Sequence, residues 1–248
     1  MNTFLAELVK ARTTRLLFWY AVGLAAFLTL VVSIHVATGQ RFDLEQASSQ
    51  RSLFAASGLV AVLAVLIGIV LLASEYNHGT INQSFLAVPN RLRLLLAKLV
   101  AAALIGGALG LLAGALMLVL AELWYGGRGL SLHLGNGTTT PLLGAIAASI
   151  LAASVGIGLA ALIRRQTATI VVVLLWLLIG ENIIAISPHA ARYAPGHVLG
   201  AIVAAHGNTT SDTLAAWAAV GVGLVYAVVL FIVGTLVVLG SDAPTAGD

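Results

Sequence analysis

Residues 74–98 read SEYNHGTINQSFLAVPNRLRLLLAK, a polar stretch between two long apolar runs. Ser74 can cap a helix that begins at Glu75, because a serine oxygen accepts hydrogen bonds from the free N–H groups of a first helical turn. The dipole of that helix also favours the Glu75 carboxylate at its start. Pro89 ends the helix, since the residue before a proline is pushed out of the helical region. The apolar face of the predicted helix consists of Ile81, Phe85 and Val88.

The composition is that of a membrane protein. The chain has 248 residues, of which 60% are hydrophobic and 8% are charged, and its mean hydropathy is +1.05. Soluble domains usually carry about 25% charged residues. There is no cysteine, which excludes disulfides and thiol catalysis. The net charge is +3, but the basic residues stand at the ends of apolar runs, so no nucleic-acid partner is expected.

Six apolar runs predict six transmembrane helices, because about 20 residues are needed to cross a bilayer core of about 30 Å. The expected spans are residues 16–37, 53–73, 99–120, 142–163, 167–186 and 214–239. Residues 1–15 are predicted to form an amphipathic helix at the interface, residues 74–98 a segment between spans two and three, and residues 187–212 an external segment. The prediction is an all-α integral membrane protein with one transmembrane domain over residues 1–248.

The Lys and Arg residues predict the orientation, since cytoplasmic loops carry an excess of them. With the N-terminus inside, eight of the twelve fall on the inner side: Lys10, Arg12, Arg15, Arg91, Arg93, Lys98, Arg164 and Arg165. The outer side holds the other four: Arg41, Arg51, Arg128 and Arg192. Both termini and residues 74–98 are therefore expected in the cytoplasm.

A polar helix between two spans has two interpretations. It can rest on lipid headgroups, or it can dock a soluble partner. Its polar positions are mostly amides and hydroxyls, whereas a helix that lies on anionic lipid is expected to be rich in Lys and Arg. The composition favours docking.

The order Glu75, Gly79-Thr80, Pro89, Arg91 and Lys98 resembles the segment after the second span in ABC-2 type transporter permeases. In that family the segment is the coupling helix that sits on the ATP-binding subunit. The resemblance implies an ABC exporter in the bacterial plasma membrane, in which two six-span subunits, either two copies or a copy and a paralogue, move a substrate. It also implies these ATPase-coupling residues: Glu75, Gly79, Thr80, Phe85, Pro89 and Arg91.

ATP is expected in a partner chain. A Walker A loop ends in Gly-Lys-Ser/Thr, but the two lysines, Lys10 and Lys98, follow Val9 and Ala97. ATP and Mg are thus assigned to the separate subunit, and this chain is predicted to be a non-catalytic transport subunit without cofactors of its own. Two alternatives remain open: an importer-type ABC permease, and a channel or membrane enzyme that works without an ATPase.

Glu181 and Asn182 are polar residues in the outer part of the fifth span. A carboxylate inside a membrane is by default a candidate functional group, so these two residues are candidates for lining the translocation pathway. The alternative is a carboxylate that reaches outer water or hydrogen-bonds to the neighbouring external segment.

Glycines pose two further questions. Gly106, Gly110 and Gly114 form a small face on the third span, which predicts close helix packing, either within one chain or between two copies. Gly79 indicates either close approach of the partner or a break between two short helices, because glycine costs about 1 kcal/mol within a helix. Five of the six histidines lie on the outer side, too scattered to predict a metal site.

Overall fold

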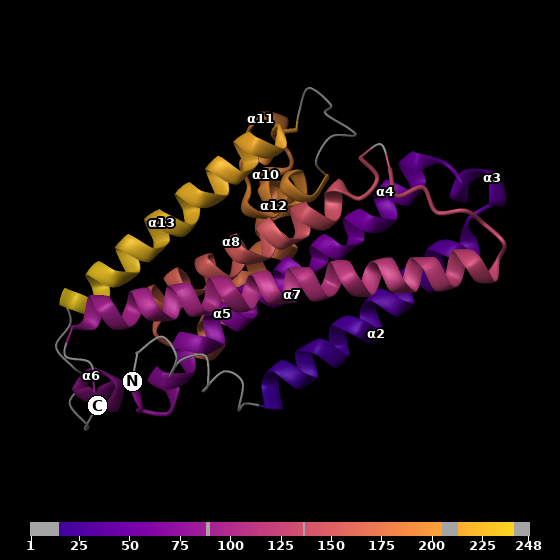
Figure 1. Ribbon diagram of the computed structural model, residues 1–248. Helices are drawn as coiled ribbons and strands as arrows, with labels where there is room; N and C mark the ends of the chain where they lie inside the picture. The colour runs from indigo at the N-terminus through magenta and orange to yellow at the C-terminus, as the bar shows by residue number, and fades with distance from the viewer. Residues whose placement is uncertain (1–14, 88–89, 136, 205–212, 241–248) are drawn as a thin grey trace.

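The computed structural model describes residues 15–87, 90–135, 137–204 and 213–240. Their regular structure is helical, and six helices are long and apolar enough to cross a membrane (Figure 1), which confirms the predicted fold class. The chain therefore has the construction of a multi-pass membrane protein. The predicted amphipathic helix over residues 1–15 lies outside the described residues, apart from Arg15 itself.

In the described part of the chain, the six candidate spans are built from ten helical segments. They are α2 (Arg15–Thr38); the stacked α4 (Ala47–Ala55), η1 (Ala56–Leu59) and α5 (Val60–Asn77); α7 (Arg91–Gly127); α8 (Thr140–Ile163); the stacked α9 (Gln166–Leu175), η2 (Trp176–Gly180) and α10 (Glu181–Ile184); and α13 (Ala216–Gly240). Four shorter helices connect them: α3 (Arg41–Leu44), α6 (Ile81–Ala87), α11 (Pro188–Ala191) and α12 (Pro195–Ala204).

The third span is longer than predicted. α7 has 37 residues and begins at Arg91, not at residue 99, because Arg and Lys are good helix formers and need not interrupt a helix. The side chain of Asn90 accepts a hydrogen bond from the Arg93 N–H at 3.1 Å, and such a cap stabilises a helix start. Lys98 thus lies within the helix, in its third turn.

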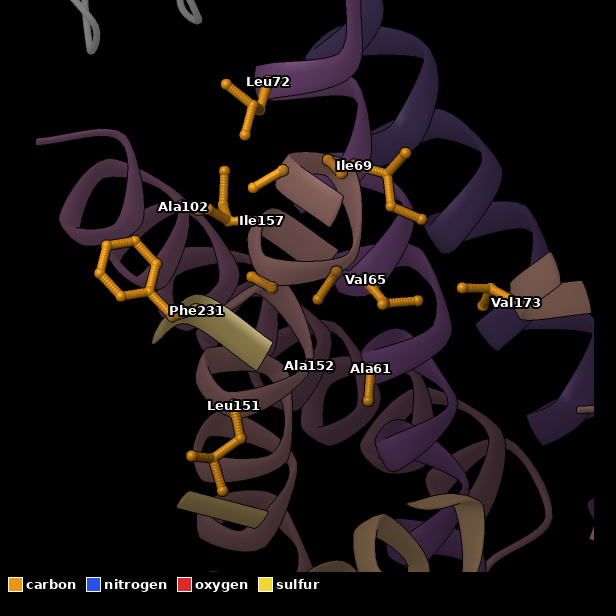
Figure 2. Close-up of a cluster of buried hydrophobic side chains, with 14 of the residues drawn as sticks. Ala61, Val65, Ile69, Leu72, Ala102, Leu151, Ala152, Ile157, Val173 and Phe231 are labelled. Carbon is orange, nitrogen blue, oxygen red and sulfur yellow. The ribbon is translucent and has the colours of Figure 1, made fainter. Parts of the chain in front are cut away.

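α8 is the central helix. It contacts α5, α7, α12 and α13. In its most apolar stretch of 18 residues 61% of the residues are buried, whereas the corresponding share is 17% in the span formed by α9, η2 and α10. In Figure 2, side chains from α5, α8 and α13 gather in one cluster, among them Ile69, Ile157 and Phe231. Small residues on α8 allow this close packing.

The glycine face of α7 packs inside the chain. A Cβ on Gly106 would lie 2.5 Å from the Ser149 carbonyl oxygen, and one on Gly110 would lie 2.6 Å from the Ile146 Cα. A Cβ on Gly114 would lie at an ordinary 3.7 Å from Leu142. Of the two interpretations of this face, the structure therefore supports packing against α8 within one chain.

The short helices divide between the two ends of the bundle. α6 lies at one end, which we call the α6 end, and α10, α11 and α12 lie together at the other, which we call the α12 end (Figure 1). α12 packs against α8 and α13, so the segment predicted to be external contributes an apolar helix to the bundle.

Candidate functional site

The polar stretch that follows the second span is not one helix. α5 continues through Ser74 and Glu75 to Asn77, and α6 begins only at Ile81. The prediction of a single helix beginning at Glu75, capped by Ser74, is wrong.

Gly79 explains the interruption. Its φ is +66°, in the left-handed region that glycine enters without steric cost. A Cβ at this position would have nothing within 4 Å, so no close approach by this chain accounts for the glycine. Of the two interpretations of Gly79, the break between two helical pieces is confirmed.

Glu75 is buried in an ion pair. Its Oε1 lies 2.8 Å from Nζ of Lys98, and the two side chains are 2% and 0% exposed. The hydroxyl of Ser84, on α6, donates a hydrogen bond to the other carboxylate oxygen at 3.3 Å. One carboxylate therefore connects α5, α6 and α7. Sequence reasoning missed Lys98 as the partner, since 23 residues separate it from Glu75.

Arg91 connects α6 to the last span. Its guanidinium carbon lies 5.0 Å from the centre of the Phe85 ring, and Nη1 donates to the Val238 carbonyl at 3.3 Å. Arg164 donates to the neighbouring carbonyl of Val237. Both cations thus lie near the C-terminal end of α13, where the helix dipole favours positive charge.

α6 exposes a different surface from the one predicted. Ile81 is buried and Phe85 is half-buried, whereas Gln83 is exposed and Leu86 is 83% exposed. We call Gln83 and Leu86 the α6 surface. Sequence reasoning missed Leu86; the available signal was a large apolar residue off the Ile81–Phe85 face.

The predicted coupling residues therefore have different places. Glu75 is internal, Gly79 is in the exposed turn, and Thr80 and Phe85 are half-buried. Arg91 is held by Phe85 and α13. Pro89 lies outside the described residues.

The second buried carboxylate lies at the α12 end. Glu181 is 8% exposed, and its Oε1 accepts hydrogen bonds from the indole N–H of Trp176 at 2.9 Å and from the backbone N–H of Gly196 at 2.7 Å. Its Oε2 lies 2.9 Å from Nδ1 of His197. We call these four residues the Glu181 clasp. Glu181 therefore hydrogen-bonds to residues of the 187–212 segment, one of the alternatives for this carboxylate. The external position of that segment stays a prediction.

Local backbone geometry assembles the clasp. Trp176 and Glu181 are five residues apart and share a face because η2 is a π-helix, a form that recurs at functional sites. Gly196 follows Pro195 at the start of α12, where backbone N–H groups have no partner within the helix. A Cβ on Gly196 would lie 2.9 Å from the Glu181 carboxyl carbon, so glycine permits the contact.

Asn182 does not join the clasp. Its side chain donates to the Leu178 carbonyl of its own helix at 2.7 Å, on the exposed side. Within the described part of the chain there is no group of three His, Asp or Glu side chains that could hold a metal ion.

No protein-family model matches the sequence, and no curated protein matches it. The resemblance to ABC-2 type permeases therefore rests on the sequence of residues 74–98 alone.

Proposed function

We propose that this chain is the membrane-spanning permease subunit of an ATP-driven ABC exporter, with ATP and Mg bound by a separate subunit. The observation that carries the proposal is the position of α6. This helix lies at the end of the bundle, is tied to α5 and α7 by the buried pair of Glu75 and Lys98, and presents an exposed apolar residue, Leu86.

The contacts of α6 suit it to transmit movement. A partner that binds the α6 surface would move α5 and α7 through Glu75, and α13 through Arg91. The backbone N–H of Gln166 also donates to the Asn77 side chain at 3.3 Å, which joins the start of α9 to the end of α5. A displacement of α6 would thus reach four spans.

The exposed side chain of Leu86 supports docking of a protein. A buried leucine contributes about 1.5–3 kcal/mol relative to an exposed one, so a protein partner would gain from covering it. The α6 surface also offers Gln83, an uncharged hydrogen-bonding side chain. In this proposal Leu86 is the main contact with the ATP-binding subunit.

Cysteine crosslinking tests the proposal, because the natural chain contains no cysteine. Gln83→Cys places a single thiol on the α6 surface, and Glu122→Cys places one on an exposed position near the other end of α7. In membranes of the native host, a photoreactive maleimide attached to the thiol of the Gln83→Cys variant should crosslink a protein with a Walker A loop, and ATP should change the yield. The Glu122→Cys variant should give no such product.

A labelling experiment tests whether a cytoplasmic ATPase can reach α6. In intact cells, a membrane-impermeant maleimide should label the Glu122→Cys variant and leave the Gln83→Cys variant unlabelled. Labelling of Gln83→Cys from outside would end the proposal, since no cytoplasmic ATPase could then bind α6.

Leu86→Ser tests the docking residue in the purified complex. We expect the ATP hydrolysis that depends on this chain to fall by about tenfold when the ATP-binding subunit is below saturation. A loss of about 1.4 kcal/mol in binding free energy raises the Kd by that factor. The control is Leu123→Ser, a leucine that is 60% exposed on α7 near the α12 end. Equal ATP hydrolysis in the two variants would contradict the assignment of Leu86.

A further inference from the structure

An apolar pocket lies within the bundle, beside the Glu181 clasp. It has a volume of about 290 Å³ and is bounded by α5, α8, the α9–η2 span, α12 and α13. Aliphatic side chains form its walls, such as Val65, Val155, Val173 and Leu199. Figure 2 shows Val65 and Val173 on two neighbouring helices, α5 and α9. A cavity of this lining excludes water and takes up apolar ligands.

The size of the pocket suits a short hydrocarbon chain. Its lining residues on α8 run from Leu151 to Leu159, a length of about 12 Å at the rise of an α-helix. A cavity of about 150 Å³ takes up benzene with its six carbons, so this pocket has room for roughly ten.

The Glu181 carboxylate lies behind one wall of the pocket and is not itself a lining residue. Trp176 and Gly196 both line the pocket, and both donate hydrogen bonds to Glu181. The other carboxylate oxygen meets His197, whose side chain is 47% exposed, so Glu181 lies between the apolar interior and an accessible side. Tyr226 also lines the pocket. Aromatic faces such as those of Trp176 and Tyr226 attract cations.

We propose that this pocket binds a single-chain amphiphile with a cationic head group. The alkyl chain fills the apolar interior, and the head group lies beside the rings of Trp176 and Tyr226, at the wall behind which Glu181 lies. Carboxylate and aromatic faces attract a quaternary ammonium and disfavour an anionic head group on the same chain. The inference concerns binding by this chain alone and does not depend on the transport function proposed above.

Fluorescence quenching of Trp176 tests the binding. The full-length chain carries four tryptophans, and changing Trp19, Trp124 and Trp217 to Phe leaves Trp176 as the reporter. In phosphatidylcholine nanodiscs, decyltrimethylammonium with bromine at the chain end should quench this variant with a saturating curve. Unbrominated decyltrimethylammonium should restore the fluorescence by competition.

The matched control measures partition of the probe into lipid. A variant that keeps only Trp217, which is 82% exposed and outside the pocket lining, should be quenched without saturation. If the two reporters respond alike, or if the unbrominated compound does not compete, the pocket does not bind the probe and the proposal fails.

Substitutions locate the chain and the head group. Val155→Phe fills the pocket and should weaken binding of the cationic probe by about tenfold or more, whereas Val119→Phe, at a 57% exposed position on α7, should not.

Glu181→Gln should weaken binding of the cationic probe by roughly fivefold and leave binding of bromodecanol unchanged. Bromodecanoate should bind the parent more weakly than either probe. Equal affinities of the three head groups would overturn the assignment of Glu181, and unchanged binding to Val155→Phe would overturn the site.

Discussion

Among the described residues, each end of the bundle buries one carboxylate, and the partners of the two carboxylates differ. At the α6 end, Glu75 is paired with an ammonium, Lys98, on the neighbouring span. At the α12 end, Glu181 is held by two uncharged donors, the Trp176 indole and the Gly196 backbone, together with the half-exposed His197.

The two ends differ in what their separation would leave unpaired. Removing one partner of a buried ion pair leaves a charge without compensation and costs about 3–5 kcal/mol, so α5 and α7 are firmly joined at Glu75. Separation of α12 from η2 would instead break hydrogen bonds to the Glu181 carboxylate, worth about 1.5–3 kcal/mol each. It would leave no lysine without its carboxylate partner. The two contacts have similar energies, and they differ in whether a second buried charge loses its partner.

The largest effect should come from Lys98→Met, which keeps most of the side-chain volume and removes the charge. We expect a loss of about 3–5 kcal/mol in the free energy of unfolding, because Glu75 stays buried without its ammonium partner. SDS-induced unfolding in mixed micelles measures this quantity.

The double variant Glu75→Gln, Lys98→Met serves as the control. Replacing both charges should recover most of the lost stability, since neither buried charge then remains. A double variant as unstable as Lys98→Met would show that volume, and not charge, determines the effect.

An intermediate effect is expected for Trp176→Phe at the α12 end. The change removes one hydrogen bond to the Glu181 carboxylate, worth about 1.5–3 kcal/mol, while an aromatic ring remains. Because the Gly196 N–H bonds to the same oxygen, hydrogen exchange of the peptide over residues 194–200 should become faster. Trp217→Phe, at an exposed position, is the matched control; equal protection in both variants would contradict a role for the indole N–H.

The smallest effect is expected from Gly79→Ala. The φ of +66° costs an alanine about 1–2 kcal/mol, and no side-chain clash contributes. Gly200→Ala, in α12 and also with open space around its Cβ, should instead stabilise the protein by up to about 1 kcal/mol. Thermal unfolding measures both variants. A lower midpoint temperature for Gly79→Ala with a higher one for Gly200→Ala would support the turn at Gly79, and shifts of the two midpoints in the same direction would argue against it.

The spans were predictable because a bilayer demands long apolar runs, and such runs are visible without any knowledge of the fold. Their ends were not. Lys98 looks like the flank of a span, yet it lies inside α7, because its charge is satisfied by Glu75 from another helix. Hydropathy measures each residue alone and cannot detect a partner 23 residues away.

The candidate sites were predictable to a similar extent: the sequence identified single residues but not their partners. Glu181 was identifiable as an acid in an apolar run, but its donors depend on the π-helix at η2 and on the placement of α12 against the bundle. His197 was one of several outer histidines, and no sequence spacing distinguishes it. Gly79 had two interpretations in the sequence. Its backbone conformation shows the break between two helices, and close approach of a partner stays a prediction.

The length of α7 has a mechanical consequence. Its 37 residues correspond to a rod of about 55 Å, nearly twice the roughly 30 Å thickness of a hydrocarbon core. Such a rod is a lever: pivoting it by roughly 10° about one tip sweeps the other through about 10 Å. A small rotation where Lys98 is gripped would thus become a large excursion near Tyr125, without any bending along the way.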